Sequence, residues 1–202
     1  MIWGLLELAQ ADGDARWLAW TRELQQRQDA LFWDEADGGW FSTTGQDTTV
    51  LLRLKEDYDG AEPSASSVAV NNLLLRAHLT QDDEARKKVE RTLARYGPRA
   101  GRAARVIPMM LANLSHWHAG TSQIVIVGTR DAAAPLLSEV ARHYLPFAIV
   151  IPVSAGERPR EIADLTVSMQ MKDGQPTAYV CRDFACREPV TTADALGAQL
   201  ES

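Results

Sequence analysis

The pattern of apolar residues changes at Gly120, and this change limits the folds open to the chain. Before Gly120 the apolar residues recur at the spacing of an α-helix. After it, the aliphatic runs 124–127 and 148–151 flank a helical pattern over 131–144. Strand, helix and strand in this order predict a βαβ unit with parallel strands and a right-handed crossover. The remaining expected elements are a third strand over 177–181 and a last helix over 192–200.

The part before Gly120 is predicted to consist of helical hairpins. The expected helices cover residues 2–11, 15–32, 63–80, 84–96 and 104–117. We expect Gly97-Pro98 to end one of these helices and Pro108 to interrupt another. Repeated antiparallel helix pairs are typical of α/α arrays, in which each pair needs neighbours to bury its apolar face. We therefore predict two domains, a helical-hairpin segment over 1–119 and a small α/β unit over 120–202.

Aromatic residues flank a tight-turn signal that follows the second expected helix. The sequence Asp37-Gly38-Gly39 predicts a short hairpin that brings Trp33, Trp40 and Phe41 to a common surface. Two roles are open for Trp33 and Trp40: they could pack in the core, or they could stack against a sugar. After the hairpin, β-branched and aliphatic residues predict one short strand over 48–54.

The stretch from Lys55 to Ser67 carries the richest set of candidate functional groups. Its four carboxylates are candidate catalytic residues: Glu56, Asp57, Asp59 and Glu62. Acid–base chemistry on a sugar needs two carboxyl groups in different environments, and neighbouring carboxylates raise one another's pKa. The alternative is a solvated acidic turn, because carboxylates also suit the positive end of a helix dipole. The candidate substrate-binding residues are Lys55, Tyr58, Ser64, Ser66, Trp33 and Trp40.

Charge and motif content exclude several classes of function. The net charge is −6, so we expect no nucleic acid and no anionic membrane among the partners. No apolar run is long enough to span a membrane. The basic residues from Arg99 to Arg105 are interpreted as a solvated face. Glycine-rich phosphate-binding motifs are absent, and His116 and His118 diverge on a helix, so we predict no cofactor and no metal ion.

The chain has two cysteines, Cys181 and Cys186. So few cysteines do not make a disulfide scaffold, and their spacing differs from the C-x-x-C of a redox site. We expect both thiols to be reduced and to act as small apolar side chains. Reduced thiols fit the reducing environment of the cytoplasm, so we expect a cytoplasmic protein.

The stretch Leu54-Lys55-Glu56-Asp57-Tyr58-Asp59-Gly60-Ala61-Glu62-Pro63-Ser64 is followed by a helix that contains Asn72-Leu73-Leu74. With these residues, which are the specific part of the match, the chain resembles the C-terminal half of the YyaL-like, spermatogenesis-associated thioredoxin-domain proteins. Other matching stretches follow the same order: Phe32-Trp33-Asp34, Gly38-Gly39-Trp40-Phe41-Ser42 and the tail from Tyr179 to Thr191. One departure is Ser66, which stands where the family pattern usually has Asn.

The resemblance implies a six-hairpin (α/α) toroid, similar to those of N-acylglucosamine 2-epimerases and six-hairpin glycosidases. It places Asp57, Asp59 and Glu62 at the mouth or inner wall of the toroid. The chain has too few helices to close such a ring and contains no thioredoxin-like motif, so we expect a C-terminal segment of a longer protein. The expected fold is therefore mainly α, a partial toroid followed by a small α/β unit.

Two functions remain open at this point. The first is the binding of a carbohydrate, or chemistry on it, at the acidic stretch. The second is a non-catalytic module that completes a larger protein or an oligomer. In that case exposed apolar helix faces would contact a partner chain or a second copy.

Overall fold

The computed structural model describes residues 1–154, 159–182 and 185–201. The chain forms two compact units. The first contains Met1–Trp3, Trp20–Ala77 and Gln81–His118, and the second contains Gly4–Ala19, His78–Thr80 and Ala119–Ser202. Helix α1 (Ile2–Asp12) therefore contributes mostly to the second unit, which the sequence did not predict.

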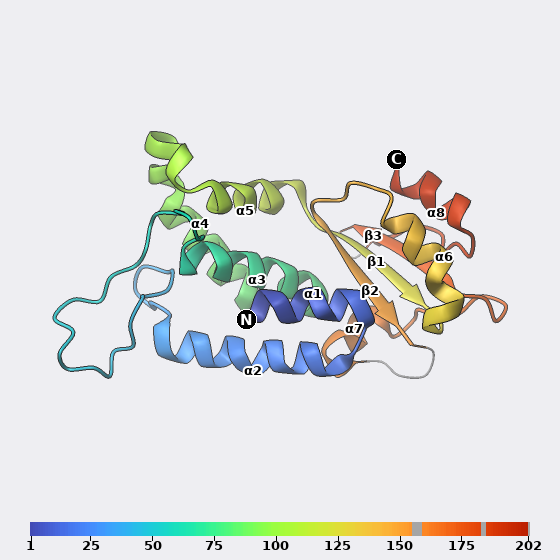
Figure 1. The fold of residues 1–202 in the computed structure, drawn as a ribbon, viewed down its shortest axis with the longest axis horizontal. Helices are drawn as coiled ribbons and strands as arrows, with labels where there is room; N and C mark the ends of the chain where they lie inside the picture. Colours follow the sequence, from blue (N-terminus) through green and yellow to red (C-terminus); the bar gives the residue numbers. More distant parts are fainter. Residues whose placement is uncertain (155–158, 183–184, 202) are drawn as a thin grey trace. The chain divides into compact units, whose positions relative to one another are not determined.

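The first unit is built from helices, and the expectation of a mainly helical chain is confirmed (Figure 1). Its helices are α2 (Ala15–Phe32), α3 (Ala65–Thr80), α4 (Asp83–Ala103), a 3-10 turn η1 (Ala104–Val106) and α5 (Pro108–Ala119). Buried side chains from α3, α4 and α5 share one core, to which Leu73, Val89 and Met110 belong. Burial of this common apolar surface is what holds the helices together.

Helix α4 does not end at Gly97-Pro98 as predicted. Proline removes one helical hydrogen bond, but interactions on both sides hold the helix across it. Tyr96 is buried and donates a hydrogen bond to the Glu56 carbonyl oxygen at 2.7 Å. One turn later, Arg99 forms an ion pair with Asp57 at 2.9 Å. Pro108 also differs from expectation, because it begins α5, where its missing N–H costs nothing.

The predicted hairpin between α2 and the acidic stretch is confirmed. Trp33 and Trp40 form an antiparallel bridge, and Gly38 and Gly39 adopt φ values of 73° and 79° in the turn. The expected strand over 48–54 is wrong, since these residues form a loop with bends and turns. Its apolar side chains have no sheet to pack against, and Leu51 is fully exposed.

The second unit contains a mixed sheet in the order β2-β1-β3-β4. Its strands are β1 (Ser122–Val127), β2 (Ala148–Val153), β3 (Thr177–Arg182) and β4 (Ala185–Cys186). Its helices are α6 (Arg130–Val140), the short η2 (Arg160–Ile162) and α7 (Ala163–Thr166), and α8 (Ala193–Leu200). Strands β1 and β2 are parallel and joined through α6, so the predicted βαβ unit is confirmed. Strands β1 and β3 are antiparallel, and β4, η2 and α7 were not predicted.

Helices α6 and α8 pack together over β1 and β3. Their shared core includes Ile124, Leu136, Val180 and Leu196. Helix α8 begins after Thr192, whose side chain accepts a hydrogen bond from the Ala195 amide. No helix among the described residues combines the length and apolar character needed to cross a membrane.

The two cysteines are joined by a disulfide, so the expectation of reduced thiols is wrong. Strands β3 and β4 pair with Cys181 directly opposite Cys186, and their Cα atoms lie 3.9 Å apart. This register brings the two sulfur atoms together across the hairpin. The bridge links neighbouring strands and leaves no free cysteine in the described part of the chain.

Candidate functional site

The residues from Lys55 to Ser67, called the acidic segment below, lie in the first unit and run into the first turn of α3. The segment contains two kinds of residue. Some of its side chains are buried and hydrogen-bonded to the surrounding helices, whereas others are exposed to solvent. This division decides which of the predicted site residues can meet a ligand.

Asp59 is buried, with 6% of its surface exposed. Its Oδ2 accepts hydrogen bonds from the Met109 amide at 3.0 Å and the Met110 amide at 3.2 Å. Its Oδ1 accepts one from the Ser64 amide at 2.8 Å. Burial alone would raise the pKa of this carboxyl, but the hydrogen bonds, led by that from Ser64, hold it below the ordinary value. Asp59 therefore stays ionised and caps the first turn of α5 from a distant part of the chain.

Ser64 and Ser66, which were predicted to bind substrate, are also buried and bonded within the protein. Ser64 is the N-cap of α3, and its hydroxyl accepts a hydrogen bond from the Ser67 amide at 3.2 Å. The Ser66 hydroxyl accepts one from the Trp40 amide at 3.3 Å. Both hydroxyls thus fix the backbone around the start of α3.

Trp33 and Trp40 contact each other in the core, with ring centroids 4.8 Å apart. Trp40 is 1% exposed, and its indole nitrogen donates to Asp29 at 2.9 Å. Trp33 is 9% exposed. A stacking platform needs an accessible ring face, so of the two interpretations the core packing of these residues fits the structure.

Lys55 joins the acidic segment to the hairpin. Its ammonium group, on a side chain only 4% exposed, contacts Asp34 at 2.5 Å and the Gly38 carbonyl oxygen at 2.7 Å. The hydrogen bond from Lys55 holds the pKa of Asp34 at about 2, below its ordinary value, with further help from the amides of Ala36 and Asp37. The pair is therefore ionised at neutral pH and ties the start of the segment to the turn.

Four of the predicted site residues in the segment are exposed, namely Glu56, Asp57, Tyr58 and Glu62. Tyr58 is 59% exposed. Of these four, Asp57 lines the cavity described below. The acidic segment thus does not bring its four carboxylates to one place, because Asp59 points to the start of α5 while Asp57 faces α4.

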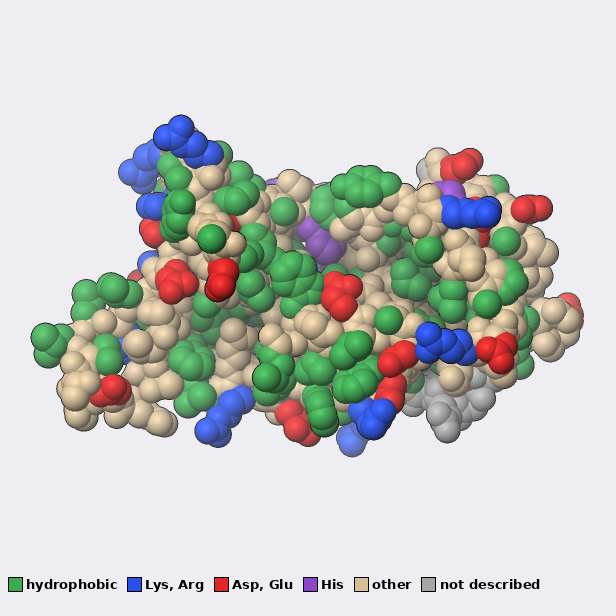
Figure 2. Space-filling model, viewed as in Figure 1, with side chains coloured by type: hydrophobic (Ala, Val, Ile, Leu, Met, Phe, Trp, Pro, Cys, Tyr) green, Lys and Arg blue, Asp and Glu red, His purple; other side chains and the backbone are tan. Residues whose placement is uncertain are grey.

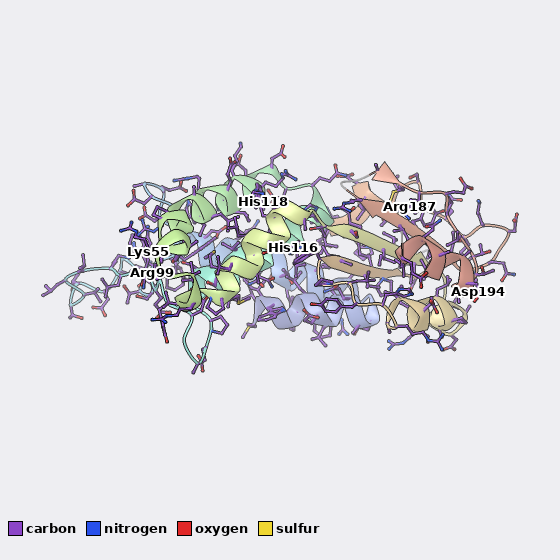
Figure 3. All side chains as sticks on the ribbon, turned by 90° about the horizontal axis from the view of Figure 1, so that it is seen from above. Lys55, Arg99, His116, His118, Arg187 and Asp194 are labelled. Carbon is purple, nitrogen blue, oxygen red and sulfur yellow. A yellow bond between two sulfur atoms is a disulfide. The ribbon has the colours of Figure 1, made fainter. Side chains whose placement is uncertain are left out.

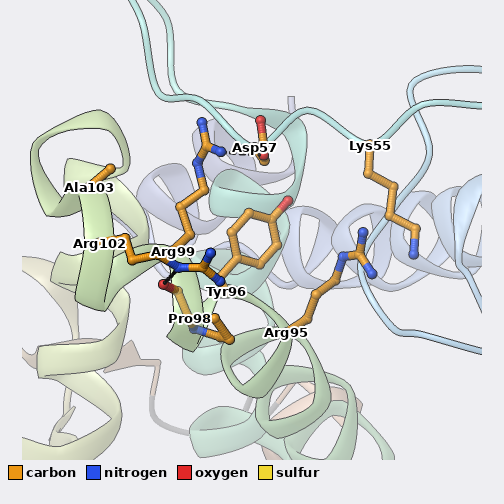
Figure 4. A pocket seen from close by; sticks show the side chains of 8 residues that line it. All are labelled: Lys55, Asp57, Arg95, Tyr96, Pro98, Arg99, Arg102 and Ala103. Atoms are coloured by element: carbon orange, nitrogen blue, oxygen red, sulfur yellow. Dashed lines mark hydrogen bonds and ion pairs between the residues drawn. The ribbon is translucent and has the colours of Figure 1, made fainter.

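The cavity has a volume of about 410 Å³ and lies between the acidic segment and the last turns of α4 (Figure 4). Lys55 and Asp57 line it on one side. The residues that α4 contributes are Arg95, Tyr96, Pro98, Arg99, Arg102 and Ala103. Lys55 and Arg99 lie at the same end of the first unit, away from His116 and His118 (Figure 3).

The arginines of this cavity were missed by the sequence interpretation, which treated the run beginning at Arg99 as a solvated face. A usable signal was present, because Arg95, Arg99 and Arg102 are spaced by four and three residues. Residues at these spacings share one face of a helix. The signal was hidden by the prediction that α4 ends before Pro98.

The two histidines of α5 differ in environment, since His116 is buried and His118 is exposed. Within the described ranges, no three His, Cys, Asp or Glu side chains converge as a metal site would require.

Comparison with known proteins gives matches along nearly the whole chain. The chain is 37% identical to human spermatogenesis-associated protein 20 over 194 residues, which are 93% of this chain and 25% of the human protein. The rat protein of the same name is 35% identical over 93% of this chain and 24% of its own length. An uncharacterized protein of Caenorhabditis elegans is 31% identical over 97% of this chain and 27% of its own length.

The chain therefore spans about a quarter of the length of the curated relatives it matches. No family model matches it. No solved structure matches it either. The predicted resemblance to spermatogenesis-associated proteins is thus confirmed as similarity in sequence to one part of spermatogenesis-associated protein 20.

Proposed function

We propose that this chain is the carbohydrate-binding segment of a longer protein and that the ligand occupies the cavity beside Asp57. The observation that carries this proposal is the polar lining of the cavity by both the acidic segment and α4. Its volume of about 410 Å³ falls in the range of small-molecule sites. Guanidinium and carboxylate groups are hydrogen-bonding partners that suit the hydroxyls of a sugar.

The geometry supports binding better than acid–base catalysis. Hydrolysis of a glycosidic bond requires two carboxyl groups on opposite sides of the bond. Asp57 is the one carboxylate that lines this cavity, and Asp59 is committed to the start of α5. We therefore assign Asp57 to ligand contact, and catalytic roles for Glu56, Asp57, Asp59 and Glu62 stay predictions.

The larger architecture is also part of the proposal. The hairpins of the first unit would be a portion of an (α/α) toroid, whose remaining helices would come from the rest of the longer protein. Two facts support this view, the paired helices around one core and the coverage of about a quarter of the relatives.

Titration calorimetry of the purified chain with a panel of monosaccharides and disaccharides tests the binding proposal. The test variant is Asp57→Asn, and the matched control is Glu35→Gln, which alters an exposed carboxylate paired with another α4 arginine. We expect one sugar to bind, and we expect Asp57→Asn to weaken it about tenfold, or by about 1.4 kcal/mol. Binding that both variants retain would move the site elsewhere, and a panel without any binding would end the proposal.

A second candidate function rests on the loop that precedes the acidic segment. Leu51, Leu52 and Leu54 are 100%, 72% and 60% exposed. Figure 2 shows hydrophobic side chains on this loop, which projects at the left of the view. Exposed apolar side chains grouped in this way mark contact surfaces, so the loop is proposed to pack against a partner chain or another part of the longer protein. If the partner chain is a second copy of this one, Leu51→Asp should lower self-association measured by light scattering.

A further inference from the structure

We propose that the cavity between the acidic segment and α4 is an anion site, and that its ligand carries a phosphate group, as a phosphorylated sugar does. This inference rests on the proposed function and names the class of its ligand. It follows from the charges that line the cavity and from the hydrogen-bond donors that its arginines present there.

Four cationic side chains and one carboxylate line the cavity. Two of the cations have acidic partners outside the lining. Lys55 pairs with Asp34, and Arg95 lies 3.6 Å from Asp37. Arg99 pairs with Asp57, the carboxylate within the lining. Arg102 is an exposed residue and has no ion-pair partner among the described residues, so the lining keeps one positive charge without a carboxylate partner.

Arg99 lines the cavity, and its Nη1 pairs with Asp57. Its Nε is buried and has no hydrogen-bond partner in the described part of the chain. Because this nitrogen is covered by protein atoms, the donors that Arg99 can offer to a ligand are those of its two Nη atoms.

Arg102 presents a second set of donors. Its Nε donates to the Pro98 carbonyl oxygen at 3.2 Å, and its guanidinium lies near Pro98 and Tyr96, while that of Arg99 reaches toward Asp57 (Figure 4). An arginine side chain has five N–H donors in a planar fork that matches the oxygens of phosphate. Arg99 and Arg102 are three residues apart on one helix, so one phosphate group between them could accept from both.

Tyr96 adds no opposing charge to the cavity. Burial raises the pKa of its hydroxyl above the ordinary value, so the side chain is neutral at physiological pH. Its hydroxyl donates to the Glu56 carbonyl oxygen and so holds the backbone next to Asp57. The floor of the site is therefore neutral and fixed, and its charge comes from the arginines.

A structural role for these arginines explains only part of the geometry. Cations near the C-terminal end of a helix are favourable, because they offset the negative end of the helix dipole. Arginines can offset the helix dipole in this way without lining a cavity. The grouping of Arg95, Arg99 and Arg102 around one cavity, together with the unpaired charge of Arg102, points instead to a bound anion.

The test is titration calorimetry of the full chain with inorganic phosphate, glucose 6-phosphate and glucose. The test variant is Arg102→Gln, which breaks no ion pair of the described structure. Arg105→Gln is the matched control, because Arg105 is an exposed arginine three residues away that does not line the cavity. Arg102→Lys separates charge from the planar fork of donors.

We expect phosphate to bind and to compete with glucose 6-phosphate. Arg102→Gln should weaken both at least about tenfold, Arg102→Lys should restore part of the loss, and Arg105→Gln should change affinity less than about twofold. Binding of glucose without competition from phosphate would overturn the anion site and leave carbohydrate binding intact. Binding of phosphate alone would keep the anion site and remove the sugar. Equal losses in Arg102→Gln and Arg105→Gln would show general charge attraction and would also overturn the inference.

Discussion

Asp57 and Asp59 are separated by one residue, yet their side chains differ in burial and in the groups they contact. Asp59 is buried and accepts three backbone hydrogen bonds, whereas Asp57 has an exposed side chain that pairs with Arg99 beside a cavity. The first holds the fold and the second is available to a ligand. The lesson is that carboxylates close in sequence need not form one site, because each follows its own contacts: Asp59 is bound by amides at the start of α5, and Asp57 by Arg99 of α4.

The largest effect is expected at the buried member of this pair. In Asp59→Asn the side-chain amide would face the backbone N–H groups of Met109 and Met110, so favourable bonds would become donor–donor contacts. We expect the free energy of unfolding to fall by about 3 kcal/mol. Urea denaturation followed by circular dichroism measures it. A loss below about 1 kcal/mol would contradict the structural role of Asp59.

Lowering the pH should weaken the ion pair between Lys55 of the same segment and Asp34, and so lower the stability of the fold. The pKa of Asp34 is depressed to about 2 in the folded chain, mainly by the hydrogen bond from Lys55, against about 3.9 in an unfolded chain. Its contribution to stability is therefore complete above about pH 4 and is lost as the pH falls toward about 2. We expect a loss of about 2 kcal/mol across this window from this group.

Asp59 should act in the same direction, because its pKa is also lowered. The two acids can be separated with Asp34→Asn, which should be less stable at neutral pH and should have a flatter acid limb. An acid limb of unchanged slope in that variant would show that the Lys55–Asp34 pair does not control the acid response.

A smaller effect is expected at the helix cap. Ser64→Ala removes the hydroxyl that accepts from the Ser67 amide, and we expect a loss of about 1 kcal/mol. Glycine is a better N-cap than alanine, so Ser64→Gly should cost only a few tenths of a kcal/mol, roughly. Thermal unfolding of the two variants side by side makes the comparison. If alanine and glycine cost the same, capping is not what Ser64 does.

The smallest effect on stability is expected at the exposed member of the pair. The side chains of Asp57 and Arg99 are 55% and 40% exposed, so water and salt screen their attraction. Asp57→Asn should change the free energy of unfolding by no more than about 0.5 kcal/mol. Urea denaturation followed by circular dichroism, as for Asp59→Asn, measures this change in the free energy of unfolding. Equal losses in the two variants would break the distinction between the buried and the exposed carboxylate.

Much of the fold could be predicted from periodicity. The predicted helix over 15–32 has the same bounds as α2, and the aliphatic runs found β1 and β2. These elements are decided by local patterns of apolar residues. The exceptions involve contacts between distant residues, such as the hydrogen bond from Tyr96 to Glu56 that helps α4 continue through Pro98.

The candidate site was harder to predict, for the same reason. No local sequence pattern predicts that Asp59 caps α5, although the sequence contains one indirect signal. Pro108 begins a helix after Val106-Ile107, neither of which can cap it, so a cap from elsewhere in the chain was needed. The disulfide depends on the register between β3 and β4, which the spacing of Cys181 and Cys186 permits but does not dictate.

The cap that Asp59 provides also sets an order of events in folding. Its bonds to Met109 and Met110 join residues 50 and 51 positions apart, and the Tyr96 hydroxyl reaches Glu56 across 40 positions. Closing such long loops is slow compared with forming a helix, because chain entropy is lost before the contact is gained. The acidic segment can thus take its final position only after α4 and the start of α5 have formed. During synthesis, the contact of Asp59 with the start of α5 would form only once residue 110 has left the ribosome.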